Sequence, residues 1–191
     1  MATVTFITHP DVAIDPSIPV PDWCLNPTGI VRMRSMLAQP WVASIGHVAS
    51  SAERKARDGA DILAGHLGLV PSVHADLGEN DRSATGYLPK PAFEALADAF
   101  FANPSQSMQG WERAVDAQTR IVGAMRAVLA SAPPGDIAVV SHGGVGALLL
   151  CHLRQSPISR AADQPPGNGG YFLSFDRASW QLQAAWRRID P

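Results

Sequence analysis

Hydrophobic and polar positions follow two different periods along this chain. Short runs of apolar or β-branched residues predict strands at residues 3–7, 42–48, 70–74 and 137–140. Apolar residues spaced three or four positions apart predict helices at about 26–39, 50–67, 93–100, 111–129 and 147–153. A hairpin is predicted at 171–175 and 180–186. This alternation predicts an α/β fold in one domain, residues 1–191, with helices on both faces of a mostly parallel sheet.

Capping signals mark several of the predicted helix ends. Asn26 followed by Pro27 is typical of a helix start, because the asparagine caps the helix and proline suits its first position. Ser50 and Glu53 have the spacing of a capping box, which predicts that the next helix begins at Ser50. Gly68 is a suitable stop for that helix.

Composition and charge narrow the class of protein. Apolar residues make up 46% of the 191 residues, enough for a hydrophobic core, and the formal net charge is -2 with no basic stripe. We therefore expect no nucleic-acid partner. Cys24 and Cys151 form no CxxC motif, which fits free thiols in a reducing compartment. With no signal core and no apolar run of about 18 residues, we expect a cytoplasmic protein without a membrane span.

Two of the predicted strands end in a histidine. Residues 6–9 read Phe-Ile-Thr-His and residues 139–142 read Val-Val-Ser-His. Ligands of open α/β sheets bind outside the carboxyl ends of the strands, so His9 and His142 are expected to face one crevice. Residues 143–146, Gly-Gly-Val-Gly, lead into a helix and offer backbone N–H groups to an anion. The other histidines (His47, His66, His74 and His152) are interpreted as structural.

Arg54 has an unusual electrostatic position. It lies in the first turn of a predicted helix, where a cation opposes the helix dipole at a cost of about 0.3–1 kcal/mol. A phosphate bound by the guanidinium would offset that cost. From spacing alone, the favoured interpretation is a solvent-facing pair with Asp58 at i+4.

Four segments together resemble the histidine phosphatase (phosphoglycerate mutase-like) superfamily. Residues 50–60 resemble the family's second-arginine helix, residues 139–145 its second-histidine motif, and residues 77–81 its acidic motif. The order His9, Arg54, Glu79, His142 matches the family order along nearly the whole chain. The resemblance implies a phosphoglycerate mutase-like three-layer fold.

The first family motif departs from its usual form. The family has Arg-His-Gly where this chain has Thr8, His9 and Pro10. The arginine that clamps phosphate beside the nucleophile is therefore replaced. Arg82, three residues after the acid, is the first candidate to supply the missing charge, ahead of Arg32 and Arg34.

The resemblance also implies a mechanism. His9 forms a phosphohistidine, and Glu79 protonates the leaving oxygen and then activates water. Arg54 and protonated His142 stabilise charge on the equatorial phosphoryl oxygens, and Gly143 and Arg82 also bind the phosphate. No metal or cofactor is expected. The implied substrate is a small phosphorylated molecule or a phosphoprotein.

The same residues allow two alternatives to phosphatase activity. One is a degenerate member that binds a phosphorylated ligand without turnover, and a weaker one is a phosphotransferase. The polar segment 79–87 is interpreted as a lid that carries the acid and selects the substrate.

Overall fold

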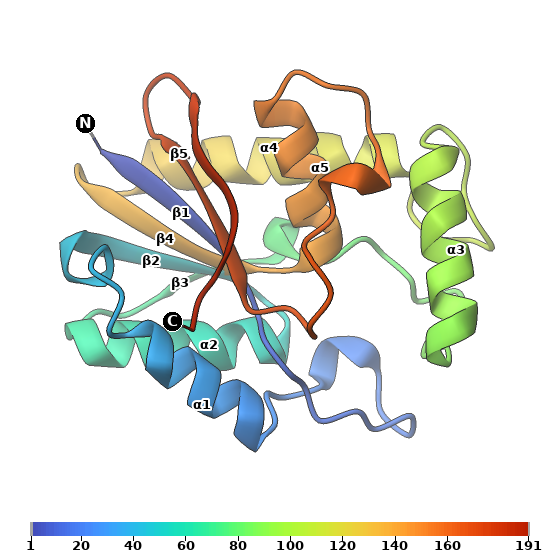
Figure 1. Cartoon of the computed structure of the whole chain (residues 1–191), viewed down its shortest axis with the longest axis horizontal. Helices are drawn as coiled ribbons and strands as arrows, with labels where there is room; N and C mark the ends of the chain where they lie inside the picture. The colour runs from blue at the N-terminus through green and yellow to red at the C-terminus, as the bar shows by residue number, and fades with distance from the viewer. Residues whose placement is uncertain (1, 191) are drawn as a thin grey trace.

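The strands form one mixed sheet between two layers of helices in the computed structural model, which describes residues 2–190 (Figure 1). The strands are β1 Thr3–Thr8, β2 Ile45–Ser51, β3 Ser72–His74, β4 Asp136–Ser141, β5 Tyr171–Asp176 and β6 Leu182–Arg188. The α-helices are α1 Pro27–Met36, α2 Arg54–Leu67, α3 Lys90–Ala102, α4 Ala114–Ser131 and α5 Gly143–Leu153. Short 3-10 helices are η1 Val20–Asp22, η2 Val42–Ser44, η3 Ala75–Leu77 and η4 Arg160–Ala162.

The strand order places four carboxyl ends at one edge of the sheet. The order is β3-β2-β4-β1-β5-β6. Strands β3, β2, β4 and β1 pair in parallel, and the hairpin of β5 and β6 adds an antiparallel side. The prediction of a mostly parallel sheet with a C-terminal hairpin is therefore confirmed. The segments that follow β1, β2, β3 and β4 therefore all begin at the same edge of the sheet.

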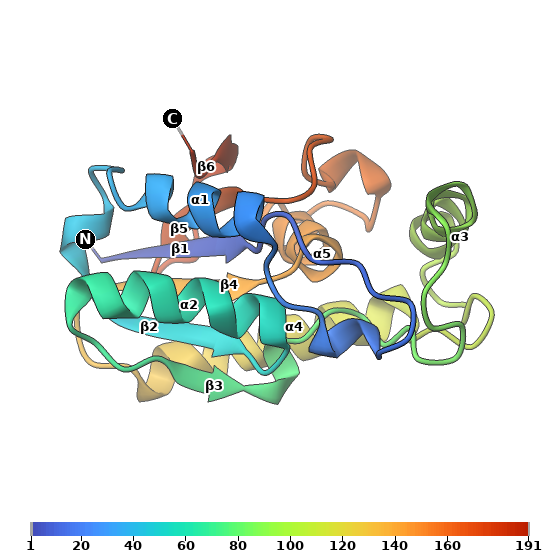
Figure 2. The ribbon, with the colours of Figure 1, turned by 90° about the horizontal axis from the view of Figure 1, so that it is seen from below.

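Side chains of the central strands alternate between two hydrophobic clusters. Val4 and Phe6 of β1 pack in a cluster with α4 and α5, whereas Ile7 packs in a second cluster with α1 and α2. Figure 2 shows α1 and α2 in front of the sheet and α4 and α5 behind it. This period of two is that of a strand buried on both faces. The expected three-layer arrangement is confirmed.

The predicted caps have different outcomes. Asn26 caps α1, because its side chain accepts the Gly29 N–H at 2.9 Å, and Gly68 ends α2 in the left-handed conformation with φ of 68°. The capping box at Ser50 is wrong. Ser50 and Ser51 are the last residues of β2, so α2 begins only at Arg54.

Strand pairing explains why β2 runs past the predicted cap. Ser50 lies opposite Val140 of β4 on one side and Val73 of β3 on the other, so both ladders hold its backbone. The strand also starts later than predicted, at Ile45, because residues 42–44 form η2. Helix α5 begins at Gly143, directly after β4, and not at residue 147.

Helix α3 lies to one side of the layers and packs against the core through Leu96, Phe100 and Phe101. In both views it lies beyond the carboxyl edge of the sheet (Figures 1 and 2). Arg160 of η4 ties it to the core through ion pairs with Glu94 and Asp98. Among residues 2–190, no helix has the length and apolar character needed to cross a bilayer.

The packing of α1 against the segment after β1 leads to a first prediction. A Cβ at Gly29 would overlap the Asp11 carbonyl oxygen, whereas a Cβ at Gly123 of α4 meets nothing within 4 Å. We expect Gly29→Ala to lower the free energy of unfolding by about 1–3 kcal/mol, because the backbone must shift. Gly123→Ala, the matched control, should raise it by about 0.5–1 kcal/mol. Urea unfolding measures both, and equal effects would contradict the packing described.

Candidate active site

The two strand-end histidines lie side by side at the carboxyl edge of the sheet. His9 follows β1 and His142 follows β4, and these neighbouring strands pair with Thr8 opposite Ser141. The His9 N–H donates to the Ser141 carbonyl at 3.1 Å. The two ring centroids are 5.2 Å apart, edge to face. Parallel strand pairing therefore sets the spacing of the two imidazoles.

His9 holds a neutral imidazole at the cleft. Its Nδ1 lies 2.9 Å from the Pro10 carbonyl oxygen. A carbonyl oxygen can only accept, so Nδ1 carries the proton and Nε2 keeps its lone pair. Burial lowers the pKa of His9 to about 3, with His142 and Lys55 adding to the effect. Nε2 is therefore an unprotonated nitrogen at neutral pH.

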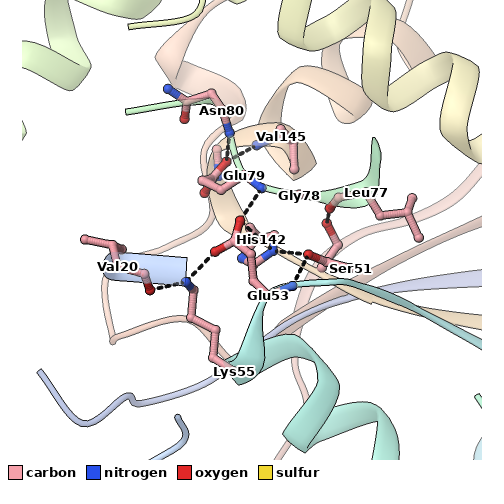
Figure 3. Close-up of polar contacts among 12 residues, drawn as sticks. Val20, Ser51, Glu53, Lys55, Leu77, Gly78, Glu79, Asn80, His142 and Val145 are labelled. Carbon is pink, nitrogen blue, oxygen red and sulfur yellow. Dashed lines mark hydrogen bonds and ion pairs between the residues drawn. The ribbon is translucent and has the colours of Figure 1, made fainter. Parts of the chain in front are cut away.

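His142 lies behind the cleft surface. It is fully buried, and its Nε2 lies 2.8 Å from Ser51 Oγ and 3.4 Å from Glu53 Oε1 (Figure 3). Its Nδ1 is buried and has no hydrogen-bond partner within residues 2–190. Burial lowers the pKa of His142 against the pull of Glu53 and Glu79. The ring is thus neutral in the free protein, with Nε2–H facing the Glu53 carboxylate, and the expectation of a protonated His142 is corrected.

Glu53 connects the parts of the site. Oε1 accepts the backbone N–H of Glu79 at 2.8 Å, and Oε2 forms an ion pair with Lys55 (Figure 3). Lys55 Nζ also donates to the Val20 carbonyl at 2.9 Å. Burial alone would raise the pKa of Glu53, but His142 and Lys55 bring it down to about 2. Glu53 is therefore ionised at neutral pH.

The prediction that Arg54 lines the phosphate pocket is corrected by the structure. Its side chain is 62% exposed, and Nε pairs with Asp58 Oδ1 at 2.7 Å, the solvent-facing arrangement favoured from spacing. Lys55, the next residue, is buried at the cleft instead. Consecutive helical residues point about 100° apart, so only one of the two can face inward. The cation that α2 supplies to the site is Lys55.

The first turn of α5 holds a carboxylate. Glu79 accepts the backbone N–H groups of Gly144 at 3.0 Å and Val145 at 2.9 Å. These are N–H groups that the sequence offered to an anion, and a side chain of the protein already occupies them. Gly143 does not line the cleft; the space beside its Cα is filled by Gln164.

Arg82 lies beside Glu79 at the floor of the cleft. Its Nη2 is 3.9 Å from Glu79 Oε2, and its guanidinium lies 5.1 Å from the ring centre of Phe93 and 5.6 Å from that of Trp111. Burial alone would raise the pKa of Glu79, but Arg82, His142 and the helix N–H hold it below the usual value. Glu79 is therefore ionised at neutral pH in the free protein.

Thr8, at the position of the family arginine, has a structural role. It is fully buried at the end of β1. Its Oγ1 donates to Gln164 Oε1 at 2.6 Å and accepts the Tyr171 N–H at 3.0 Å. These bonds join β1 to the start of β5 and to the loop before it.

Of the three arginines considered as replacements, Arg82 alone lines the cleft. Arg32 is buried and donates to Asp11 at 2.8 Å and to Asp190 at 3.1 Å, so its charge is used within the fold. Arg34 is exposed on α1.

The cleft in front of these residues has a volume of about 1160 Å³. Its floor includes Lys55 and Arg82, which are balanced by Glu53 and Glu79. Each of these two cations thus has a carboxylate partner. An entering anion must draw the cations away from the carboxylates that hold them.

Sequence reasoning missed Ser51, Glu53 and Lys55. A signal for Lys55 was present, because it lies four and eight residues before the buried Gly59 and Leu63. Arg54, in contrast, lies on the face of α2 that carries the polar residues Asp58 and Asp61.

Arg120 of α4 was also missed. It donates to the backbone carbonyls of Asp76, Gly78 and Glu79 at 2.8, 3.0 and 3.1 Å, and so holds the segment that carries the acid. No local pattern pointed to it, since its targets are more than forty residues away.

Comparison with known proteins identifies the family to which the sequence of this chain belongs. The profile described as histidine phosphatase superfamily (branch 1) matches residues 18–186. No curated protein matches the chain in sequence.

Several solved structures share the fold. A mycobacterial glucosyl-3-phosphoglycerate phosphatase in complex with inorganic phosphate has a TM-score of 0.80 at 20% identity, with 99% of each chain covered. Bacillus stearothermophilus YhfR has a TM-score of 0.78 at 16% identity, covering 100% of this chain and 98% of that one. A putative alpha-ribazole-5'-P phosphatase from Escherichia coli has a TM-score of 0.71 at 18% identity, with the same coverage.

The buried neutral histidines make stability depend on pH. Because the folded pKa of His9 lies far below the ordinary 6.5, the unfolded chain binds the extra proton and unfolding is favoured as pH falls below 6.5. Between pH 6 and 5 we expect His9→Gln to lose about 1 kcal/mol per pH unit of this dependence. Urea unfolding at several pH values measures the slope. An unchanged slope in the variant would show that His9 is not held neutral.

Proposed function

Because the chain belongs to the histidine phosphatase superfamily, we propose that it hydrolyses phosphomonoesters through a phosphoryl group carried on Nε2 of His9. The observation that carries the proposal is the bond from His9 Nδ1–H to the Pro10 carbonyl. It fixes the tautomer in which Nε2 is a nucleophile at neutral pH. The solved structures of phosphatases with the same fold are consistent with it.

In the first step, the Nε2 lone pair of His9 attacks phosphorus. The P–N bond forms as the bond from phosphorus to the ester oxygen breaks, and the departing oxygen takes a proton from Glu79. In the second step, water gives a proton to Glu79 and attacks phosphorus. The P–N bond breaks, and inorganic phosphate leaves with His9 neutral again.

Glu79 must be protonated when the ester binds. In the free protein its pKa is below the usual value, although burial works to raise it. A phosphate dianion beside it adds negative charge and competes for Arg82 and the α5 N–H groups. Each of these changes raises the pKa of Glu79, so binding of the substrate itself prepares the acid.

Lys55 and Arg82 are the cations that stabilise the transferring phosphoryl oxygens. Lys55 is held by Glu53 and lies close enough to His9 to lower its pKa. His142 supports the site from behind the cleft surface, because it is fully buried. Thr8 contributes no charge.

A second candidate function is binding of a phosphorylated ligand without turnover. The observation that favours it is the pairing of both floor cations with carboxylates, Lys55 with Glu53 and Arg82 with Glu79. Each pair reduces the positive charge that can stabilise the phosphoryl oxygens in the transition state. The experiments below distinguish the two candidates.

The phosphohistidine mechanism predicts the effect of removing the nucleophile. With a chelator present, we expect His9→Ala to lower the rate of aryl phosphate hydrolysis by about 10³-fold or more. The wild type, quenched during turnover, should carry an acid-labile phosphoryl group detectable by mass spectrometry.

His66→Ala, an exposed histidine on α2 outside the cleft, is the matched control and should keep full activity. Full activity in His9→Ala would overturn the mechanism. Saturable phosphate binding by a wild type that hydrolyses no ester would favour the second candidate.

Two adjacent cations of α2 provide a further prediction. We expect Lys55→Met to weaken competitive inhibition by vanadate at least about tenfold, because a charge-assisted contact to the anion is lost. Arg54→Met removes the same charge one residue away and should leave the inhibition constant within about twofold.

Lys55→Arg tests whether charge at this position is enough, and it should restore most of the inhibition. If Arg54→Met has the larger effect, the assignment of Lys55 to the site is wrong.

A further inference from the structure

The part of the cleft away from His9, here called the upper cleft, is lined by Ile14, Ile18, Trp23, Tyr87 and Trp111. Some of these apolar side chains are exposed to solvent. Among the described residues, the large hydrophobic side chains exposed to solvent are Ile14, Ile18, Val31, Val70, Val73 and Tyr87. Three of these six, Ile14, Ile18 and Tyr87, line this one cleft. Exposed apolar surface gathered in a concavity beside polar groups marks a ligand site.

Aromatic rings form both walls above the floor. Trp23 and Tyr87 lie 5.7 Å apart and link the segment before α1 to the segment before α3. Trp23 Nε1 donates to the Asp15 carbonyl at 2.8 Å, and Trp111 Nε1 donates to Thr85 Oγ1 at 2.8 Å. With their N–H groups satisfied by the protein, these rings can offer only apolar surface to a ligand.

The charges above the floor do not favour a second anionic group. The ionisable residues lining that region are Asp81, Glu94, Glu112, Lys90 and Arg120, so carboxylates outnumber cations. Arg120 is also bound to Glu112 at 2.7 Å. Lys90 is a cation of this set without an ion pair among the described residues, but three carboxylates line the same region, so its net negative charge still disfavours a second anionic group on the substrate.

From these observations we infer that the cleft selects phosphomonoesters whose alcohol part carries an aromatic ring. The inference rests on the proposed function, because it assigns the substrate class of the same site. The phosphate lies at the floor beside His9 and Lys55, and the ring lies between Ile14 and Tyr87. Sugar phosphates and doubly anionic esters are poor substrates.

The test uses esters that differ only in the group placed in the upper cleft. Ethyl phosphate, 2-phenylethyl phosphate and 2-carboxyethyl phosphate are primary alkyl esters with similar leaving groups. We expect kcat/KM for the phenyl ester to exceed that for ethyl phosphate by about 10- to 100-fold, the factor from burying an aromatic ring. The carboxyethyl ester should fall below ethyl phosphate. Equal values for the phenyl and ethyl esters would overturn the inference.

Variants locate the preference in the cleft. Ile14→Ser and Tyr87→Ser should each lower the phenyl-to-ethyl ratio about threefold or more, because each removes apolar contact surface. Val31→Ser is the matched control, since Val31 is 60% exposed and Ile14 61%, but Val31 lies on α1 outside the cleft. It should keep the wild-type ratio. An equal loss in all three variants would contradict the placement of the ring.

A failure of the proposed function is distinguishable from a failure of this inference. If no ester is hydrolysed, calorimetry with the non-hydrolysable 2-phenylethylphosphonate and ethylphosphonate still tests the cleft. Tighter binding of the phenyl compound, lost in Tyr87→Ser, would support ring recognition without turnover. Equal or absent binding of both would reject it.

Discussion

The Glu53 carboxylate is the interaction on which the rest of the site depends. One of its oxygens accepts the Glu79 N–H and faces His142, and the other pairs with Lys55. A buried carboxylate is unfavourable unless every lone pair has a partner, so these contacts must form together. Glu53 thereby fixes the ends of β2 and β4, the start of α2 and the segment after β3 relative to one another. His9, the remaining member, is placed by the pairing of β1 with β4.

In the empty site, the groups that could bind an anion are bound to carboxylates of the same chain. Glu79 binds the N–H groups at the start of α5, and Lys55 is paired within the chain. Such pairing lowers the cost of burying cations while the cleft is empty. The same pairing lowers the affinity for any anion, because binding replaces existing bonds and does not fill vacant ones. Affinity then depends on the rest of the ligand, which makes the apolar upper cleft important.

Periodicity and strand-end chemistry were enough to predict the layered fold and the meeting of His9 with His142, because both follow from rules about parallel sheets. The start of α2 was not predictable from its capping signal. Ser50 matches a cap locally, but pairing with β4 and β3 extends the strand through it. The choice of Arg54 over Lys55 failed for a related reason. Residue type suggested arginine, whereas the buried face of the helix is set by tertiary packing.

The contacts of Thr8 limit which substitutions residue 8 can accept. An arginine at this position would have to bury a guanidinium where Thr8 now bonds Gln164 and the Tyr171 N–H, in a space with no exposure. Restoring the usual family motif by one substitution would therefore break the junction between β1 and β5. A tolerated arginine at residue 8 would need a second change, in the loop before β5. The contacts of Thr8 thus couple the first motif to the loop before β5, so that a charged residue at this position and the present loop exclude each other.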